Sequence, residues 1–195
     1  MLAVFLDIET TGLDPARHKA IDIAMQAVDL STLQRKGHYR SVIKHPQEVW
    51  ELRDPSSTLI NGFTYTDLLT GKASPHVKEE IITFFEDHEI VRGHAIFICQ
   101  NPAFDRSFFS QIVDIPTQES LQWPYHWLDL ASMYFALQVQ ESIEQGKSFP
   151  ENITLSKNKI AERFNLPPEG QPHKALGGVN HLIECYQALF GIRFS

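Results

Sequence analysis

Hydrophobic and polar positions along the chain predict three strands at its beginning, followed by helices that alternate with shorter strands. Residues 2–8 are an apolar run typical of a buried strand, broken only by Asp7. Residues 20–28 and 40–44 predict the next two strands, with a turn near Lys36 and Gly37. The segment 45–63 is rich in Pro, Ser, Asn and Gly, which predicts a loop with at most a short helix near Val49 and Trp50.

The second half of the chain carries helix signals of spacing and capping. Ser74, Asn101 and Asp129 are expected N-caps, and Gly191 is expected to follow the last helix. Together with apolar residues at helical spacing, these signals predict helices over 74–88, 101–113, 129–145, 156–165 and 173–191. Short strands are expected at 90–91, 95–99 and 126–128. Strands first, then helices interleaved with strands, indicate one α/β domain over 1–195 with a mixed sheet.

Composition narrows the class of protein further. Hydrophobic residues make up 43% of the 195 residues and charged residues 21%, as in ordinary globular proteins. The formal net charge of −7 disfavours a broad electrostatic grip on duplex nucleic acid. The two cysteines, Cys99 and Cys185, indicate no disulfide framework, so a reducing, cytoplasmic location is expected. No leader pattern and no apolar run of about 18 residues is present, so no membrane association is expected.

Two carboxylates end the first predicted strand. Asp7 and Glu9 are two positions apart, so on a strand both side chains point to the same face. Like charges held that close repel, and a cation between them relieves the repulsion. A divalent metal ion therefore explains the pair, although a solvated pair at a strand end is the more common reading of an isolated Asp-x-Glu.

Two further segments carry candidate chemistry, and each has an ordinary structural reading. Asp105 follows Asn101 in the first turn of a predicted helix, where the helix dipole alone favours a carboxylate. Phe104, Phe108 and Ile112 are spaced four apart and predict a core stripe rather than base-stacking surfaces. Near the end of the chain, His173 precedes a helix, as a capping or solvated histidine often does.

Taken together and in order, these segments resemble the DEDDh 3′–5′ exonucleases. Residues 7–15, read Asp-Ile-Glu-Thr-Thr-Gly-Leu-Asp-Pro, match the first motif of that family without a gap. Asn101, Phe104 and Asp105 match the second motif, and His173, Ala175 and Leu176 match the third. The resemblance spans nearly the whole chain and implies an RNase H-like exonuclease fold, with a central mixed five-stranded sheet flanked by helices.

The resemblance also implies roles for individual residues. Asp7, Glu9 and Asp105 would hold two Mg²⁺ or Mn²⁺ ions, which in such sites stand ~3.5–4 Å apart and stabilise the attacking and departing oxygens. His173 would accept the proton of the attacking water, a task that suits an ordinary histidine pKa of about 6.5. The residues expected to receive the 3′-terminal nucleotide are Thr10, Thr11, Leu13 and Asn101.

One family ligand is missing from this sequence. The third motif of the family ends in an Asp two residues after the Leu, and that position is Gly178 here. Asn180 is turned about 200° away on a helix, and Glu184 is roughly 9 Å further along the axis, so neither replaces it. Occupancy of the second ion is therefore in doubt, and partial or Mn²⁺-dependent activity is as well supported as none.

Two functions stay open at this point. The leading one is a metal-dependent 3′–5′ exonuclease acting on single-stranded DNA or short RNA. The alternative is a non-catalytic module that binds a 3′ end or a nucleoside monophosphate and retains the exonuclease fold. A polymerase or a second copy of the chain is the expected protein partner. Four basic residues are a possible rim near the site, although solvated surface charge is the safer interpretation: Lys157, Lys159, Arg163 and Lys174.

Overall fold

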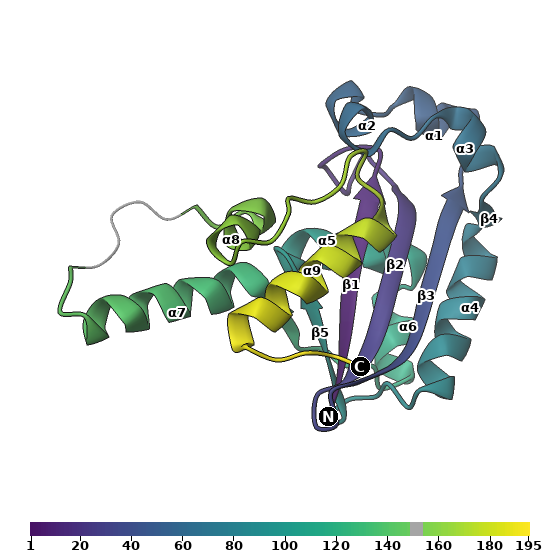
Figure 1. The fold of residues 1–195 in the computed structure, drawn as a ribbon. Helices are drawn as coiled ribbons and strands as arrows, with labels where there is room; N and C mark the ends of the chain where they lie inside the picture. Colours follow the sequence, from purple (N-terminus) through teal and green to yellow (C-terminus); the bar gives the residue numbers. More distant parts are fainter. Residues whose placement is uncertain (149–153) are drawn as a thin grey trace.

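The computed structural model describes residues 1–148 and 154–195 and is built on a mixed sheet of six strands (Figure 1). Their order across the sheet is β4-β3-β2-β1-β5-β6. β2 is antiparallel to β1 and β3, whereas β5 and β6 continue the sheet in parallel. The strands are β1 (Leu2–Thr10), β2 (Ala20–Asp29), β3 (Gln34–Lys44), β4 (Lys72–Ala73), β5 (Ala95–Cys99) and β6 (Trp127–Asp129).

The predicted mixed sheet is confirmed, with two corrections. There are six strands rather than five, because Lys72 and Ala73 add a two-residue strand beside Ile43 and Lys44. The turn between β2 and β3 lies before Gln34 and not near Gly37. Gly37 sits inside β3 where the register with β2 shifts, and glycine inside a strand often marks such a bulge.

Nine helices are present in the described part of the chain, and those expected in the second half are confirmed within a few residues. Residues 90–91 are not a strand, and Ala73 rather than Ser74 is the N-cap of α4. The helices are α1 (Gln47–Glu51), α2 (Pro55–Asn61), α3 (Tyr65–Leu69), α4 (Ser74–Asp87), α5 (Pro102–Ile112), α6 (Ile115–Ser120), α7 (Leu130–Glu144), α8 (Lys157–Arg163) and α9 (Ala175–Phe190).

The short helix expected near Val49 and Trp50 is confirmed as α1, but the rest of the segment 45–63 is not the predicted loop. It contains α2 and leads into α3, because local side chains cap these two short helices, which hydrophobic spacing does not reveal. Asp54 accepts a hydrogen bond from the Ser56 N–H at the start of α2, and Thr64 and Asp67 cap each other's backbone groups at α3. The unpredicted α6 starts in the same way, with Asp114 accepting from the Thr117 N–H.

Helices cover both faces of the sheet, so the central strand is buried on both sides. On one face α4 and α5 pack against the sheet, and the expected core stripe is confirmed because Phe108 and Ile112 are buried there and Phe104 packs against them. On the other face α9 crosses the strands and packs with α7 and α8 (Figure 1). Two-sided burial explains the apolar run over residues 2–6 of β1 and places the two carboxylates at the end of a central strand.

The two ends of the chain lie together at the end of the sheet where β1 begins, far from Asp7 and Glu9 (Figure 1). The Arg35 N–H donates to the Ser195 carbonyl, and the Met1 amino group pairs with Asp29. Among residues 1–148 and 154–195, no helix has both the length and the apolar character needed to cross a bilayer.

Candidate active site

The carboxyl end of β1 carries the first two predicted site residues. Asp7 and Glu9 are both partly buried and are paired in register with Ala24 and Asp22 of β2. Because side chains alternate along a strand, both carboxylates project to the same face. On that face Asp7 contacts the first turns of α9.

Asp105 reaches the same strand from α5. Its side chain is buried, and its Oδ1 accepts a hydrogen bond of 3.1 Å from the Ile8 N–H, between Asp7 and Glu9 in the chain. The predicted helix start therefore serves a tertiary purpose, because it pins an acidic side chain to the backbone of β1. The structure thus brings Asp7 and Asp105 together from positions 98 residues apart in the sequence.

His173 lies just before α9 and is partly buried. The backbone N–H of His173 donates to the Ile60 carbonyl, and the Nε2 atom of its imidazole is buried without a hydrogen-bond partner. The imidazole is near enough to Asp7 to favour the ionised form of that carboxyl. A buried nitrogen without a partner is costly unless something else binds there, so Nε2 is free to accept a proton or a hydrogen bond from a ligand.

Asp22 fixes the start of α9 and so the place of His173. Its fully buried Oδ2 accepts a hydrogen bond of 3.0 Å from the Ala175 N–H, at the positive end of the helix. Burial raises the pKa of Asp22, and the Ala175 N–H opposes that shift. The sequence pattern gave no sign of this role, because Asp22 sits in a strand 153 positions from its partner.

Gly178 lies directly against Asp7. A Cβ atom built at position 178 would stand 2.3 Å from Oδ2 and 2.7 Å from Oδ1 of Asp7. The Asp7 carboxylate therefore occupies space that any side chain at 178 would need. Asn180 and Glu184 are exposed, so neither supplies the missing carboxylate.

Lys157, for which the sequence favoured a solvated surface position, contacts the site. The Lys157 Nζ atom lies 3.3 Å from Oδ1 of Asp7, 3.3 Å from the Gly178 carbonyl oxygen and 3.0 Å from Oε2 of Glu169. Glu169 is buried, and its N–H donates to the side chain of Asn158, next to Lys157. Neither Lys157 nor Glu169 belongs to a motif, so local sequence patterns could not have found them.

The electrostatics of the site reflect burial first and charge second. Burial, with Asp7 and Glu169 nearby, raises the pKa of Glu9 to about 8. Burial also raises the pKa values of Asp7 and Asp105, and Lys157 opposes both shifts. Burial lowers the pKa of Lys157 itself, but Asp7 and Glu169 outweigh it and hold that pKa above its ordinary value. A bound cation would favour the ionised forms of these buried carboxyl groups, so the cluster is suited to binding one.

The expected nucleotide-binding residues differ in their exposure. Thr10 and Thr11 are buried, and their hydroxyl groups bond to Gly12 and to the Lys19 N–H within the turn. Leu13 is 71% exposed at the tip of this turn, which suits packing against a base. Asn101 is exposed in a left-handed backbone conformation, with its N–H donating to Asp129. Their contacts with a substrate stay a prediction.

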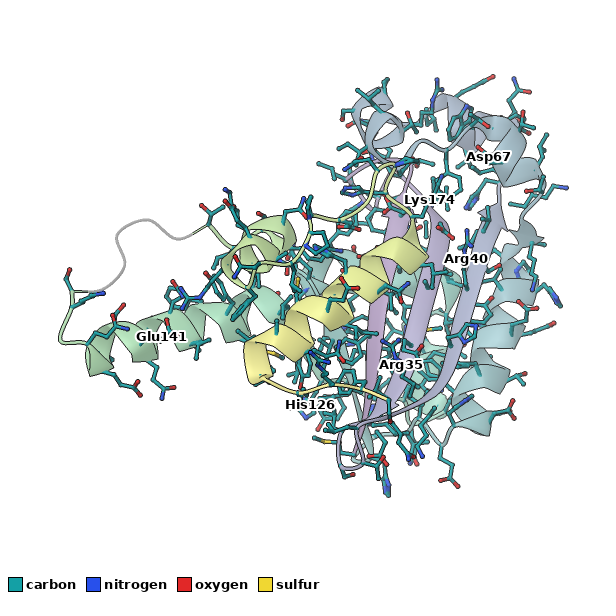
Figure 2. The ribbon with its side chains drawn as sticks, in the orientation of Figure 1. Arg35, Arg40, Asp67, His126, Glu141 and Lys174 are labelled. Carbon is teal, nitrogen blue, oxygen red and sulfur yellow. The ribbon has the colours of Figure 1, made fainter. Side chains whose placement is uncertain are left out.

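The possible basic rim is replaced by paired charges. Lys157 is partly buried and pairs with Asp7, while Lys159 pairs with Glu162 and Arg163 with Glu141 of α7. The Lys174 ammonium lies 3.3 Å from the centre of the Phe63 ring, a cation–π contact. Figure 2 shows Lys174 at the start of α9 on the side of the sheet where Arg40 projects from β3.

Comparison with known proteins agrees with this geometry. The family model described as "Exonuclease" matches residues 4–185. The chain belongs to this exonuclease family. Its fold matches that of E. coli exonuclease I, solved as a complex with single-stranded DNA, with a TM-score of 0.76 and 20% identity over 97% of this chain and 40% of the other. Cell-death related nuclease 4 gives a TM-score of 0.70 at 15% identity, over 97% of this chain and 64% of the other.

Two curated proteins are similar to this chain at the level of sequence. Exonuclease DPD1 of Arabidopsis thaliana, described as chloroplastic/mitochondrial, is 24% identical over 97% of this chain and 56% of its own length. A PolC-type DNA polymerase III of Thermotoga maritima is 27% identical over 89% of this chain and 11% of the polymerase. The chain thus spans about half of the first relative and a small part of the second. The predicted membership among the DEDDh exonucleases is confirmed.

A competing motif has a structural explanation. The segment Tyr125 to Asp129 matches the spacing of the tyrosine branch of related exonucleases. Asp129, however, accepts hydrogen bonds from the Ala131 and Ser132 N–H groups and caps α7, as predicted. Tyr125 is exposed beneath the Arg92 guanidinium. The tyrosine motif is therefore not part of the site.

Members of this exonuclease family generally use divalent metals, and some of the donors present are of the kind that such ions bind. Asp7, Glu9 and Asp105 are hard oxygen donors of the kind that Mg²⁺ and Mn²⁺ prefer. Among the described residues, no three His, Cys, Asp or Glu side chains form a ready-made metal cage. Position 178 offers no carboxylate, and the Lys157 ammonium already contacts Asp7.

Proposed function

We propose that this chain removes nucleotides from the 3′ end of single-stranded nucleic acid by hydrolysis of phosphodiester bonds. The observation that carries the proposal is the convergence of Asp7 and Asp105 with His173, whose Nε2 is buried without a hydrogen-bond partner and whose charge favours ionised Asp7. A free imidazole nitrogen next to a carboxylate cluster has the arrangement needed to take a proton from water. Membership in the exonuclease family supports this assignment.

Asp7, Glu9 and Asp105 are the proposed ligands of Mg²⁺ or Mn²⁺. When bound, such an ion lowers the pKa of water and neutralises charge on the reacting phosphate. Asp105 is held by the Ile8 N–H, so its position relative to β1 is fixed before any ligand arrives. Asp22 holds the first turn of α9 and so fixes the start of the helix that His173 precedes.

The proposed proton transfer uses His173 alone. Water attacks the terminal phosphodiester phosphorus while Nε2 accepts one water proton, and the bond from phosphorus to the 3′ oxygen of the preceding nucleotide breaks. The departing 3′ oxygen takes up a proton from solvent, and His173 returns its proton to solvent. The products are a shortened strand with a 3′-hydroxyl group and a 5′-nucleoside monophosphate. The exposed Leu13 would pack on the terminal base, and Asn101 lies at the start of the helix that carries Asp105.

Single-stranded DNA is the proposed first substrate. It is the ligand of the exonuclease I complexes that share this fold. The net charge of −7 agrees with a grip on a few terminal nucleotides rather than on long duplex. The polymerase relative makes a polymerase a reasonable partner to test first, and a homodimer and a cytoplasmic location stay predictions.

The experiment follows a 5′-labelled single-stranded oligonucleotide with wild type, Asp7→Asn and His173→Gln, in Mg²⁺ and then in Mn²⁺. We expect a ladder of products shortened from the 3′ end that disappears in Asp7→Asn. We expect His173→Gln to slow cleavage by ~10²-fold or more, as for loss of a general base. His94→Gln, at an exposed histidine elsewhere in the chain, is the matched control and should leave the rate unchanged.

One observation favours a second candidate, the non-catalytic 3′-end-binding module. Lys157 pairs with Asp7, and position 178 has no carboxylate, so the site departs from a full set of metal ligands. Retention of the oligonucleotide without cleavage in either metal, by a wild-type protein shown to be folded, would favour this module over the exonuclease.

A further inference from the structure

The Lys157 ammonium is enclosed among oxygen atoms at the centre of the site. Its side chain is 10% exposed, while those of Asp7 and Glu169 are 18% and 6% exposed. The three contacts to Asp7, Glu169 and the Gly178 carbonyl match the three N–H groups of an ammonium. The ammonium thus has no N–H left over, and it neutralises two carboxylates from different parts of the chain.

The contacts come from three separate segments that close around one point. Lys157 is the first residue of α8, which Ser156 caps, and Glu169 lies on the loop that leads from α8 toward α9. The third contact is the backbone of α9 at Gly178. Because Gly178 has no side chain, the Asp7 carboxylate lies against α9 and Lys157 reaches both.

A divalent ion held between Asp7 and position 178 would compete with this arrangement. Lys157 contacts Oδ1 of Asp7, so the ion would bind the remaining Oδ2 of the same carboxylate, and two cations on one carboxylate repel each other at short range. It would also lack the carboxylate that the DEDDh motif places at position 178. The ammonium supplies positive charge at this place without either requirement.

We propose that Lys157 is a tethered cation that replaces one of the two divalent ions of the DEDDh site, so that this chain binds no more than one. The inference rests on the proposed function only in treating this cluster as the exonuclease metal site. Lys157 is then a positioning residue, which holds Asp7 toward α9 and keeps the acidic cluster together in the absence of metal.

The test counts Mn²⁺ ions by titration calorimetry and by the electron paramagnetic resonance signal of free Mn²⁺. We expect saturation at one ion or fewer per chain for wild type and at two for the double variant Lys157→Met with Gly178→Asp. Two ions on wild type would overturn the proposal, as would a folded double variant that gains none. No ion on wild type would agree with the proposal while removing the metal-dependent activity proposed above.

A second measurement keeps the proposal testable if the double variant does not fold. Lys157→Met leaves Asp7 and Glu169 without their counter-charge, so its melting temperature in EDTA should fall by on the order of 10 °C. Mn²⁺ should recover part of the loss. Lys159→Met, at an exposed lysine of the same helix, is the matched control. Equal melting temperatures for Lys157→Met and Lys159→Met in EDTA would also overturn the proposal.

Discussion

Gly178 and Asp7 are in direct contact across the interface between α9 and β1. A Cβ atom at position 178 would lie within 2.7 Å of both carboxylate oxygens of Asp7, whereas one at Gly177 would meet no atom within 4 Å. The two adjacent glycines therefore have different reasons to be there. Gly178 makes room for Asp7 and for the approach of Lys157, and no contact in the structure explains Gly177.

This difference predicts opposite effects of the same substitution at neighbouring positions. Gly177→Ala should raise the free energy of unfolding by about 0.5–1 kcal/mol, because alanine favours the helix and fills open space. Gly178→Ala should lower it, because the Asp7 carboxylate must move away from the new methyl group. Urea denaturation of both variants in EDTA measures the difference, and stabilisation by both would show that Asp7 does not rest against α9.

Gly178→Asp should behave differently from a simple restoration of a metal ligand. In EDTA it places a second carboxylate against Asp7, so we expect overpacking to lower the free energy of unfolding by about 1–3 kcal/mol relative to wild type. Adding Lys157→Met should be needed before Mn²⁺ stabilises the protein strongly and before cleavage from the 3′ end increases. Comparing the single and double variants in melting and cleavage assays measures this. A single variant as active as the double one would contradict it.

Asp22→Ala should weaken the fold and the site together. It removes the acceptor of the buried Ala175 N–H, which we expect to lower the free energy of unfolding by about 1–3 kcal/mol. Cleavage should fall further than in the matched variant Asp87→Ala, an exposed position, because His173 precedes the loosened turn. The check is denaturation in parallel with the oligonucleotide assay at a temperature where both variants are folded. An unchanged free energy of unfolding and an unchanged cleavage rate would show that Asp22 does not hold the start of α9 in place.

His45 should contribute a pH dependence that is independent of the site. Burial lowers its pKa below the ordinary value of 6.5, with partial opposition from the hydrogen bond between Nε2 and the Ala20 carbonyl. The unfolded chain then binds a proton at His45 more readily than the folded chain, so stability declines as the pH falls below 6.5. His45→Gln should make that decline shallower. Titration of His45 by NMR gives its pKa directly, and a value above 6.5 would reverse the expected sign.

Local patterns along the chain were enough to predict the main strands and the long helices. Two-sided burial of β1 is visible as an apolar run, and helix spacing and caps are visible around Asp129 and Gly191, since both depend on neighbouring residues. The short helices α2 and α3 were missed, because capping by Asp54 and Thr64 decides them rather than a long apolar stripe. The grouping of Asp7, Glu9, Asp105 and His173 in one site came from the resemblance of three sequence motifs to the exonuclease family.

The tertiary structure alone decided what surrounds these residues. Lys157 reads as a surface charge in the sequence, because nothing within a few positions shows that α8 packs beside α9 and that Glu169 approaches from the following loop. A buried ammonium is stable only where distant carboxylates meet it, and Asp7 lies 150 positions away. The sequence by itself determined that a carboxylate is missing at Gly178. Only the packing of α8 and α9 on β1 determined that a cation from within the chain stands beside that gap.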